Sequence, residues 1–277
     1  MKQATGKVIS NEQILKELER PGARTILGSW LLWLECPEIA HEARPGQFVM
    51  VVCGSESFLP RPFSIHQVKG DNLALFFAAY EDGKGTTWLS QVKVASKIGL
   101  LGPLGNGFSI YPGSHNLLLV AGGIGIAPLY FLATQALNHS HEVKLILGAS
   151  GAFKPSGEPN PVQHYPEELL PRGIEIETIT TSPDGMTGNV VELIPGHVSW
   201  ADQVFACGPL PMYKTMAQMP ELKGKQVQVS LEVVMGCGRG VCYGCTIKTK
   251  SGLKRVCEHG PVFHLDDILW DEFTLKS

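Results

Sequence analysis

Residues 117–136 read LLLVAGGIGIAPLYFLATQA, and the folding of the middle of the chain depends on them. The stretch is apolar over roughly the length that spans a bilayer. However, three glycines and a proline lie between a strand-like apolar run and a helix-like one. This pattern is typical of a buried strand, a tight turn and a helix. We therefore expect a soluble strand-turn-helix unit here and no membrane association.

Two glycine-containing turns stand where a ligand phosphate could bind. Each follows an apolar strand and opens a helix, so its backbone N–H groups could meet a pyrophosphate. The turns are AGGIGIAPL, with Gly122, Gly123 and Gly125, and CGPLPM, with Cys207, Gly208 and Pro209. For either turn alone, the alternative is a tight βα turn without a ligand. If both belong to one parallel sheet, they lie side by side at its C-terminal edge, where such folds bind ligands.

Strand and helix patterns alternate through residues 114–231, which predicts a parallel sheet covered by helices. The expected strands are Leu117–Ala121, Val143–Leu147, Ile174–Thr180, Val204–Ala206 and Gln226–Leu231, and the expected helices are Ala127–Leu137, Val190–Leu193 and Leu210–Met219. We interpret residues 114–231 as an α/β dinucleotide-binding domain.

Residues 1–113 have a different texture, with short apolar runs broken by glycine, proline and charge. The runs are ARTILGSWLLWLEC, GQFVMVVC, PFSIHQV, NLALFFAAY and KIGLLGPLG. Their spacing and their β-branched and aromatic residues predict an antiparallel β-barrel or sandwich, of which we take the barrel, interrupted by one short helix near Thr86–Gln91.

Within this half, the segment RPFSI at residues 61–65 is followed by GKGTTWL at residues 83–89. Glycine and threonine at a helix start suit a pyrophosphate, with which Arg61 could pair bidentately. A solvated arginine beside a strand serine is the alternative for RPFSI alone. Together the two segments favour a flavin site.

Four cysteines, Cys237, Cys242, Cys245 and Cys257, crowd into the last fifth of the chain with the spacing C-x4-C-x2-C-x11-C. A plant-type [2Fe-2S] site has C-x4-C-x2-C followed by a more distant fourth cysteine. Zinc is the rival, although zinc ribbons usually have two C-x2-C knuckles and this chain has one. The glycines in this loop favour iron and sulfide, because a loop wrapped around the cluster needs positive φ angles and close N–H groups. We interpret residues 232–277 as a small cluster domain that a metal site organises, because it is too short for an ordinary core of its own.

Composition narrows the class of protein further. The chain has 277 residues, 44% of them hydrophobic, and its formal net charge of −3 offers no basic field for nucleic acid. The N-terminus has no apolar stretch long enough for a signal peptide, so we expect a cytoplasmic protein. Cys36, Cys53 and Cys207 lie among apolar residues and are expected to be small buried side chains.

The chemistry of the predicted sites supplies an independent reason for a flavin. Nicotinamide carries electrons as hydride pairs, whereas a [2Fe-2S] centre accepts one electron at a time. A chain with both sites needs a carrier that can do either, and flavin is that carrier.

The order of the motifs, RPFSI with GKGT, then GGIGIAPL, then CGP, then four cysteines, resembles the electron transfer subunits of two-component, NAD-linked dihydroorotate dehydrogenases over nearly the whole chain. The resemblance implies a ferredoxin reductase-like fold with FAD, NAD as co-substrate and a [2Fe-2S] cluster. It also implies an FMN-containing catalytic partner and a heterotetramer with two copies of each chain. By this likeness FAD would be held by Arg61, Pro62, Phe63 and Ser64, lie along Ala78, Ala79 and Tyr80, and place its pyrophosphate at Gly85 and Thr86.

The sequence departs from related reductases at two places. Many of them have tyrosine before the motif serine, where Phe63 stands here, so a phenolic hydrogen bond is not expected. No Arg or Lys follows the strand expected to end at Gly148, which favours NAD over NADP. Two alternatives stay open: the small subunit of a ferredoxin-NADP-type or sulfide-linked reductase, and a non-enzymatic iron-sulfur redox sensor.

Overall fold

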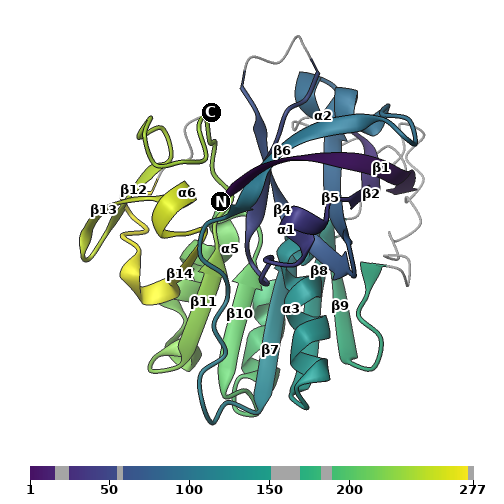
Figure 1. Ribbon diagram of the computed structural model, residues 1–277. Helices are drawn as coiled ribbons and strands as arrows, with labels where there is room; N and C mark the ends of the chain where they lie inside the picture. Colours follow the sequence, from purple (N-terminus) through teal and green to yellow (C-terminus); the bar gives the residue numbers. More distant parts are fainter. Residues whose placement is uncertain (16–24, 55–58, 151–168, 182–188, 274–277) are drawn as a thin grey trace.

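The computed structural model describes residues 1–15, 25–54, 59–150, 169–181 and 189–273. In the N-terminal half, six antiparallel strands close into a barrel in the order β1-β2-β5-β4-β3-β6 (Figure 1). The strands are β1 (Lys2–Leu15), β2 (Ile26–Glu35), β3 (Phe48–Val51), β4 (Arg61–Lys69), β5 (Asn72–Tyr80) and β6 (Lys97–Leu104). Helix α1 (Pro37–Ala40) follows β2, and α2 (Lys84–Ser90) follows β5. The predicted barrel and its short helix at α2 are confirmed.

Alternating side chains fill the barrel, as strands with one buried face require. Leu32 and Leu34 of β2, Ile65 of β4 and Leu75 of β5 are all fully buried in one cluster. Their neighbours along the strands point outward. This alternation determines which residues of β4 and β5 can face a bound flavin.

The second half forms a six-stranded sheet in the order β14-β11-β10-β7-β8-β9. All pairs are parallel except β14 with β11. The strands are β7 (Asn116–Gly122), β8 (Glu142–Ser150), β9 (Glu175–Thr181), β10 (Gln203–Cys207), β11 (Gln226–Ser230) and β14 (Val262–His264). The helical elements between them are η1 (Gly123–Gly125), α3 (Ile126–Asn138), η3 (Val190–Leu193), α4 (Ile194–His197), α5 (Leu210–Gln218) and η4 (Pro220–Leu222).

Helix α3 lies between the sheet and the barrel. Its residues Leu129 and Leu132 share one buried cluster with Leu119 of β7 and with Ala74 and Phe76 of β5. The stretch 117–136 is therefore a strand, a turn and a helix, as predicted. None of the helices in the described ranges is long and apolar enough to span a membrane.

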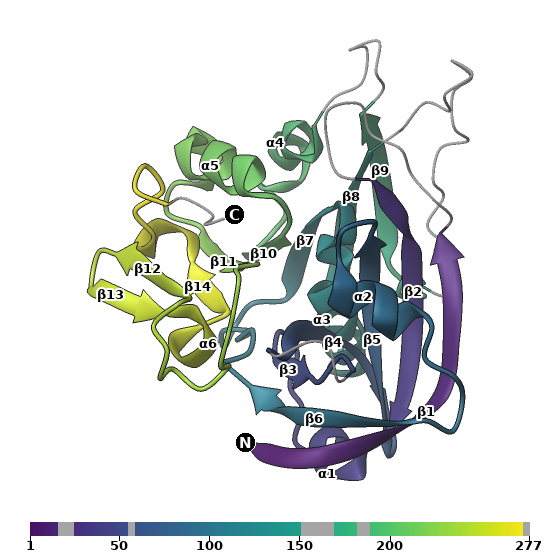
Figure 2. The same cartoon turned by 90° about the horizontal axis from the view of Figure 1, so that it is seen from above.

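The cysteine-rich C-terminal segment packs beside both the barrel and the sheet (Figures 1 and 2). It contains the hairpin β12 (Thr246–Thr249) and β13 (Gly252–Arg255), helix α6 (Val256–His259), β14 and the turn η5 (Leu265–Asp267). The segment does not depend on a metal alone for a core. Trp270 stacks on Tyr213 of α5 with ring centroids 5.5 Å apart, and both belong to a cluster that includes Met50 of the barrel.

The sequence analysis missed the first strand. β1 has few apolar residues; Val8 is buried in the barrel core and Ala4 packs against it. Its backbone pairs with β2 on one side and β6 on the other, so ladder hydrogen bonds rather than a hydrophobic pattern stabilise it. The helix expected at Val190–Leu193 is a 3-10 turn that continues into α4.

Candidate functional site

The two glycine-containing turns lie side by side. β7 and β10 are parallel neighbours with Ala121 opposite Cys207, so both strands end at the same edge of the sheet. A Cβ on Gly208 would come 3.0 Å from the Cα of Gly122, and a Cβ on Gly125 would overlap the backbone carbonyl of Cys207. Only glycine permits this approach. The predicted adjacency of the turns is confirmed.

The first turn is open toward a ligand. Gly123 has a φ of +58°, and nothing lies within 4 Å of the Cβ that another residue would place there. No side chain caps the start of α3. The turn η1 leads directly into α3, because the N–H of Ile126 donates to the carbonyl of Gly123. The N–H groups that begin this helical run are therefore those of Gly123–Gly125, and the start of such a run suits an anion such as a pyrophosphate.

The second turn is held by hydrogen bonds beneath it. The N–H of Gly208 donates to the hydroxyl of Tyr213 at 2.8 Å, and that hydroxyl donates to the carbonyl of Ser230 at 2.6 Å. The Cys207 thiol points at the carboxylate of Glu232, 3.8 Å away. Burial and the neighbouring Glu232 charge raise the pKa of Cys207 well above its ordinary value, so the thiol stays protonated. The sequence analysis did not identify Glu232, which belongs to no recognisable motif.

The two flavin segments also meet. A Cβ on Gly85 would lie 3.1 Å from Cγ of Arg61, so the arginine stem packs on the start of α2. The Arg61 guanidinium donates to the carbonyl of Leu59 at 2.8 Å. Thr86 donates its hydroxyl to the carbonyl of Gly83 at 3.1 Å. The fold thus joins RPFSI and GKGT at one end of the barrel.

The predicted flavin residues of β4 and β5 divide between two faces. Phe63 and Phe77 belong to the barrel core, where their rings meet edge to face with centroids 5.4 Å apart. Since neighbours on a strand point to opposite faces, Pro62 and Ser64 of β4 lie on the outer face. Ala78 and Tyr80 of β5 share that outer face, and these four residues are partly exposed. Ala79 is fully buried, so Phe63 and Ala79 present only backbone to the outer face.

The four predicted cluster ligands form two pairs of thiols. The Sγ atoms of Cys245 and Cys257 are 3.3 Å apart. Cys242 donates a side-chain hydrogen bond to Cys237. Although burial raises the pKa of Cys237, N–H groups of Arg239 and Cys242 and the Cys242 thiol lower it to about 6. Burial, reinforced by Cys245, raises the pKa of Cys257.

Two thiol pairs suit a [2Fe-2S] cluster, which has two irons and four cysteine ligands. Within the described part of the chain, no group of three or more His, Cys, Asp or Glu side chains is placed so that it could hold a single metal ion. The loop backbone also forms a hydrogen bond to one of the thiols, since the N–H of Gly240 donates to Sγ of Cys257 at 3.2 Å. Gly238 and Gly240 have φ angles of +65° and +71°, the conformation that the sequence analysis expected of this loop.

The cysteine-rich loop touches the flavin end of the barrel. A Cβ on Gly236 would lie 3.6 Å from Sγ of Cys242 and 3.9 Å from Cδ1 of Leu59. Leu59 is the residue whose carbonyl holds Arg61. The cysteine-rich loop therefore lies next to Leu59, and Leu59 binds Arg61 of the flavin motif. The cluster ligands and the flavin motif are close in the fold, although they lie far apart in sequence.

A flavin-type barrel, an α/β sheet with paired turns and a cysteine loop define a ferredoxin reductase-like protein. The fold matches an NADH-dependent reduced ferredoxin-NADP oxidoreductase with a TM-score of 0.75 and 26% identity, over 96% of this chain and 90% of the other. It also matches a ferredoxin NADP+ reductase from Neisseria gonorrhoeae with a TM-score of 0.59 and 18% identity, over 79% of this chain and 90% of the other.

Sequence relatives narrow the class. Residues 232–269 match the iron-sulfur cluster binding domain of dihydroorotate dehydrogenase B. A dihydroorotate dehydrogenase B (NAD(+)) electron transfer subunit of Desulforamulus reducens is 36% identical over 88% of this chain and 93% of its own length. One from Caldanaerobacter subterraneus is 36% identical over 82% of this chain and 87% of its own. The chain belongs to the family of dihydroorotate dehydrogenase B (NAD(+)) electron transfer subunits. The assignment of individual residues to FAD, NAD and the cluster stays a prediction.

Proposed function

We propose that this chain carries electrons from a dihydroorotate-oxidising partner to NAD+ in pyrimidine biosynthesis, holding a [2Fe-2S] cluster and FAD along the way. The observation that carries the proposal is the packing of the cysteine-rich segment on the barrel beside the flavin motif, where Met235, Cys245 and Cys257 share a buried cluster with Met50, the ladder partner of Pro62. The dinucleotide turns lie at the edge of the neighbouring sheet. Bound FAD exchanges hydride pairs with nicotinamide and single electrons with the cluster.

Each part of the chain has a distinct task in this proposal. Arg61 pairs with the FAD pyrophosphate at Gly85, and the outer face of β4 and β5 supports the flavin ring. The turns at Gly123 and Gly208 receive the pyrophosphate of NAD. The four cysteines bind the two irons. No residue in these sites is placed to abstract a proton from dihydroorotate, so that step belongs to the partner.

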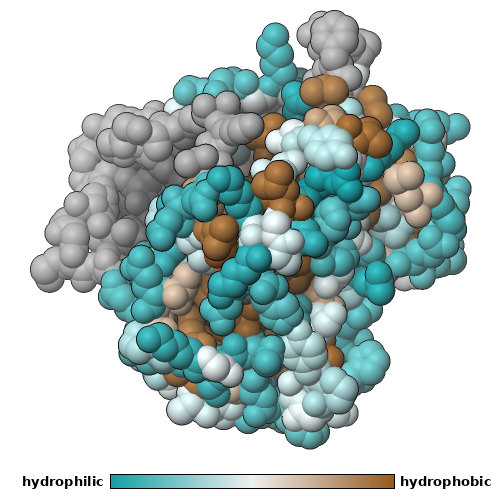
Figure 3. Space-filling model, turned by 90° about the vertical axis from the view of Figure 1, so that its left-hand side faces the viewer, coloured by the Kyte–Doolittle hydropathy of each residue, from teal (hydrophilic) through white to brown (hydrophobic). Residues whose placement is uncertain are grey.

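We further propose that the partner bears FMN and docks on the cysteine-rich segment, in an assembly with two copies of each chain. Four exposed apolar side chains of this segment support the docking: Val234, Val241, Tyr243 and Leu253, each more than 60% exposed. On this side of the molecule, apolar patches alternate with hydrophilic atoms (Figure 3). Apolar side chains so exposed are typical of an interface. Cys242 is itself exposed beside them, so a redox centre of the partner could approach a cluster ligand.

We also propose that the chain uses NAD rather than NADP and that it is located in the cytoplasm. The relatives carry NAD(+) in their names. β8 runs to Ser150, beyond the Gly148 expected from the sequence, and the residues that follow it lie outside the described ranges. Cys36, Cys53 and Cys207, outside the predicted cluster site, are buried free thiols, and free thiols persist in a reducing compartment such as the cytoplasm.

The alternative of a ferredoxin-NADP-type reductase has some support in the fold, because the match to the NADH-dependent ferredoxin-NADP oxidoreductase covers nearly the whole chain at 26% identity. The family relatives are more similar, at 32–36% identity. A redox sensor would need neither the paired turns nor the outer face of the barrel.

The experiment is a reconstitution. The chain alone should pass electrons from NADH to an artificial dye but should not oxidise dihydroorotate. Addition of a purified FMN-bearing dihydroorotate dehydrogenase subunit should create dihydroorotate-dependent reduction of NAD+, and variants without the cluster should lose it. Dihydroorotate oxidation by the chain alone, or full NAD+ reduction without the cluster, would refute the proposal. Electron transfer to ferredoxin in place of the dihydroorotate subunit would support the alternative.

A further inference from the structure

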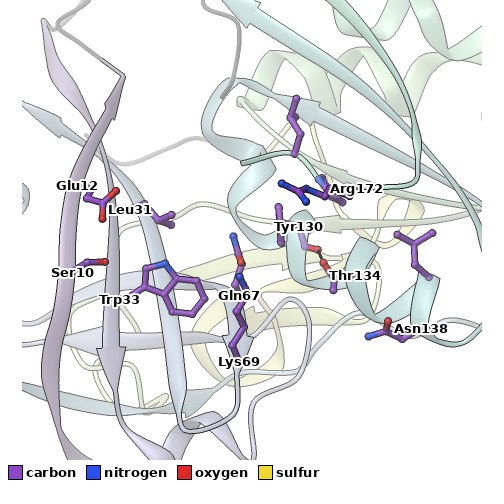
Figure 4. Close-up of a pocket in the computed structure, with 13 residues that line it drawn as sticks. Ser10, Glu12, Leu31, Trp33, Gln67, Lys69, Tyr130, Thr134, Asn138 and Arg172 are labelled. Carbon is purple, nitrogen blue, oxygen red and sulfur yellow. Dashed lines mark hydrogen bonds between the residues drawn. The ribbon is translucent and has the colours of Figure 1, made fainter. Parts of the chain in front are cut away.

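A cavity of about 720 Å³ opens between the barrel and α3, away from the sites described above (Figure 4). Its walls come from β1, β2 and β4 on the barrel side and from α3 and residues 170–172 on the other. Lys69 lines it at the far end of β4 from Arg61. Eight residue steps separate these positions, which is roughly 26 Å at about 3.3 Å per residue. The cavity is therefore not part of the proposed flavin site.

The size of the cavity suits a small organic ligand. Cavities of about 300–1,000 Å³ at domain interfaces are where such ligands bind. Tyr130 and Thr134 line it from α3, the same helix that begins at the first dinucleotide turn. A ligand here would touch both the barrel and that helix.

Two cationic side chains, Lys69 and Arg172, line the cavity from opposite walls. Neither forms an ion pair with an acidic residue of the described ranges, and the Lys69 ammonium lies 5.1 Å from the centroid of the Trp33 ring. Burial raises the pKa of Tyr130, and the positive charge of Arg172 acts against it. Arg172 is thus close to Tyr130, which is half-buried. Cations gathered in one cavity favour an anionic ligand, and guanidinium favours a phosphate or carboxylate.

Aromatic and amide groups lie between the cations. Trp33 and Gln67 occupy the middle of the cavity in Figure 4, with Arg172 and Thr134 across from them. Gln67 is only 4% exposed, so its amide is held in place. An aromatic ring of a ligand can stack on Trp33.

The β1 strand adds an acidic side chain to the barrel wall, at a different place from Lys69 of β4. Ser10 and Glu12 project from β1 beside Trp33. Glu12 accepts hydrogen bonds and repels anions, so it favours the hydroxyl or N–H groups of a ligand. The ligand that matches has an anionic group at one end, a ring in the middle and hydrogen-bond donors at the other end.

We infer that this cavity binds a nucleoside monophosphate, with its phosphate near Arg172, its base along Trp33 beside Lys69 and its hydroxyl or N–H donors toward Glu12. Inorganic phosphate would leave the aromatic wall uncovered. An uncharged nucleoside would leave Arg172 without an anion. The site is independent of the proposed electron transfer and would make the chain responsive to the nucleotide pool.

Isothermal titration calorimetry on the full chain with its cofactors tests the inference, with uridine 5′-monophosphate as the probe. Excess NAD+ is included to fill the dinucleotide turns. We expect saturable binding with one site per chain, and at least tenfold weaker binding of uridine, inorganic phosphate and orotate. The double variant Lys69→Gln/Arg172→Gln should bind at least tenfold more weakly. Lys93→Gln/Lys223→Gln, which changes the net charge equally at two exposed lysines outside the cavity, should bind as the parent does.

Several results would overturn the assignment. They are absence of saturable binding in the presence of NAD+, undiminished binding by the Lys69→Gln/Arg172→Gln variant, and binding of inorganic phosphate or orotate as tight as that of the nucleotide. FAD and iron content equal to the parent's would show that the double variant folds. The variant Trp33→Leu, which keeps both cations, should also bind at least tenfold more weakly.

Discussion

Gly238 of the cysteine-rich loop lies against Met50 of the barrel strand β3, so closely that a Cβ on Gly238 would come 2.5 Å from the Cγ of Met50. Met50 is in turn the ladder partner of Pro62 in the flavin motif. Neighbouring strands are about 4.8 Å apart, so a single strand separates the cluster loop from the motif. The glycine, with its φ of +65°, is what allows the loop to lie this close.

Cys257→Ser should abolish the iron-sulfur cluster and leave FAD bound. Cys257 is 3% exposed and pairs with Cys245, and neither belongs to the predicted FAD residues. Iron analysis and the visible spectrum measure the outcome. The control Cys36→Ser changes a buried cysteine in the barrel and should keep full iron content. A Cys257→Ser protein with the parent's iron and absorption would show that Cys257 is not a ligand.

Arg61→Ala should weaken FAD retention by about 1.5–3 kcal/mol, or about 10- to 150-fold in affinity, the usual size of a charge-assisted contact to a phosphate. Arg61→Lys keeps the charge but loses the bidentate geometry, so its affinity should be intermediate. Lys97→Ala removes an exposed charge elsewhere in the barrel and serves as the control. Flavin fluorescence after dilution and gel filtration measures retention. Equal retention by Arg61→Ala and the control would remove Arg61 from the site.

Gly125→Ala should raise the KM for NADH at least tenfold with FAD and cluster still bound. Its methyl group would overlap the carbonyl of Cys207, so the two turns must separate. Gly196→Ala is the matched control in the same sheet domain, because nothing lies within 4 Å of a Cβ there. Steady-state oxidation of NADH with a dye acceptor compares them. Similar KM values in the two variants would mean that the spacing of the turns does not determine dinucleotide binding.

His66 should make the protein less stable at acidic pH. Its ring is fully buried between β4 and α3, with Nδ1 2.9 Å from the carbonyl of Ala127. Burial lowers its pKa from the ordinary value to about 4, against the effect of that hydrogen bond. The unfolded chain therefore binds a proton between pH 6.5 and 4 while the folded chain does not, and stability falls by about 3 kcal/mol over this window.

His66→Gln can still donate a hydrogen bond to Ala127 but does not titrate in this pH range. The variant should therefore lack the part of the acid-induced loss of stability that comes from His66. The measurement is the Tm of parent and variant from pH 7 to pH 4.5, where carboxyl groups contribute equally to both. His139→Gln, at an exposed histidine after α3, should behave like the parent. Parallel pH profiles for the parent and His66→Gln would contradict the assignment.

Most of the fold could be predicted because its signals are local. The glycine turns, the α/β alternation and the cysteine spacing each depend on residues close in sequence. β1 could not be predicted, because its stability comes from partners on both sides that no short window contains. The shared core of the C-terminal segment is likewise non-local, since it joins Trp270 to Tyr213 and Met50.

In the candidate site, too, local features could be predicted from the sequence and non-local ones could not. Adjacency of the two turns could be inferred, since parallel strands end at one edge of a sheet. The orientation of Phe63 could not, because a motif does not reveal which face of β4 turns inward. Neither Glu232 beside Cys207 nor the cavity at Lys69 belongs to a sequence motif. Each brings together residues from distant elements.

Val241→Glu should weaken docking of the catalytic partner without affecting electron transfer within the chain. Val241 is 71% exposed and directly precedes the exposed Cys242, so a buried charge at an interface here would lack a partner. The partner concentration that gives half-maximal dihydroorotate-dependent NAD+ reduction should rise about tenfold or more, equivalent to about 1.4 kcal/mol. Val94→Glu adds the same charge at a 62% exposed valine of the barrel and should change that concentration less than twofold. Transfer from NADH to a dye should equal the parent's in both variants. If both raised the concentration equally, net charge rather than a docking surface would explain the effect, and the partner would bind elsewhere on the chain.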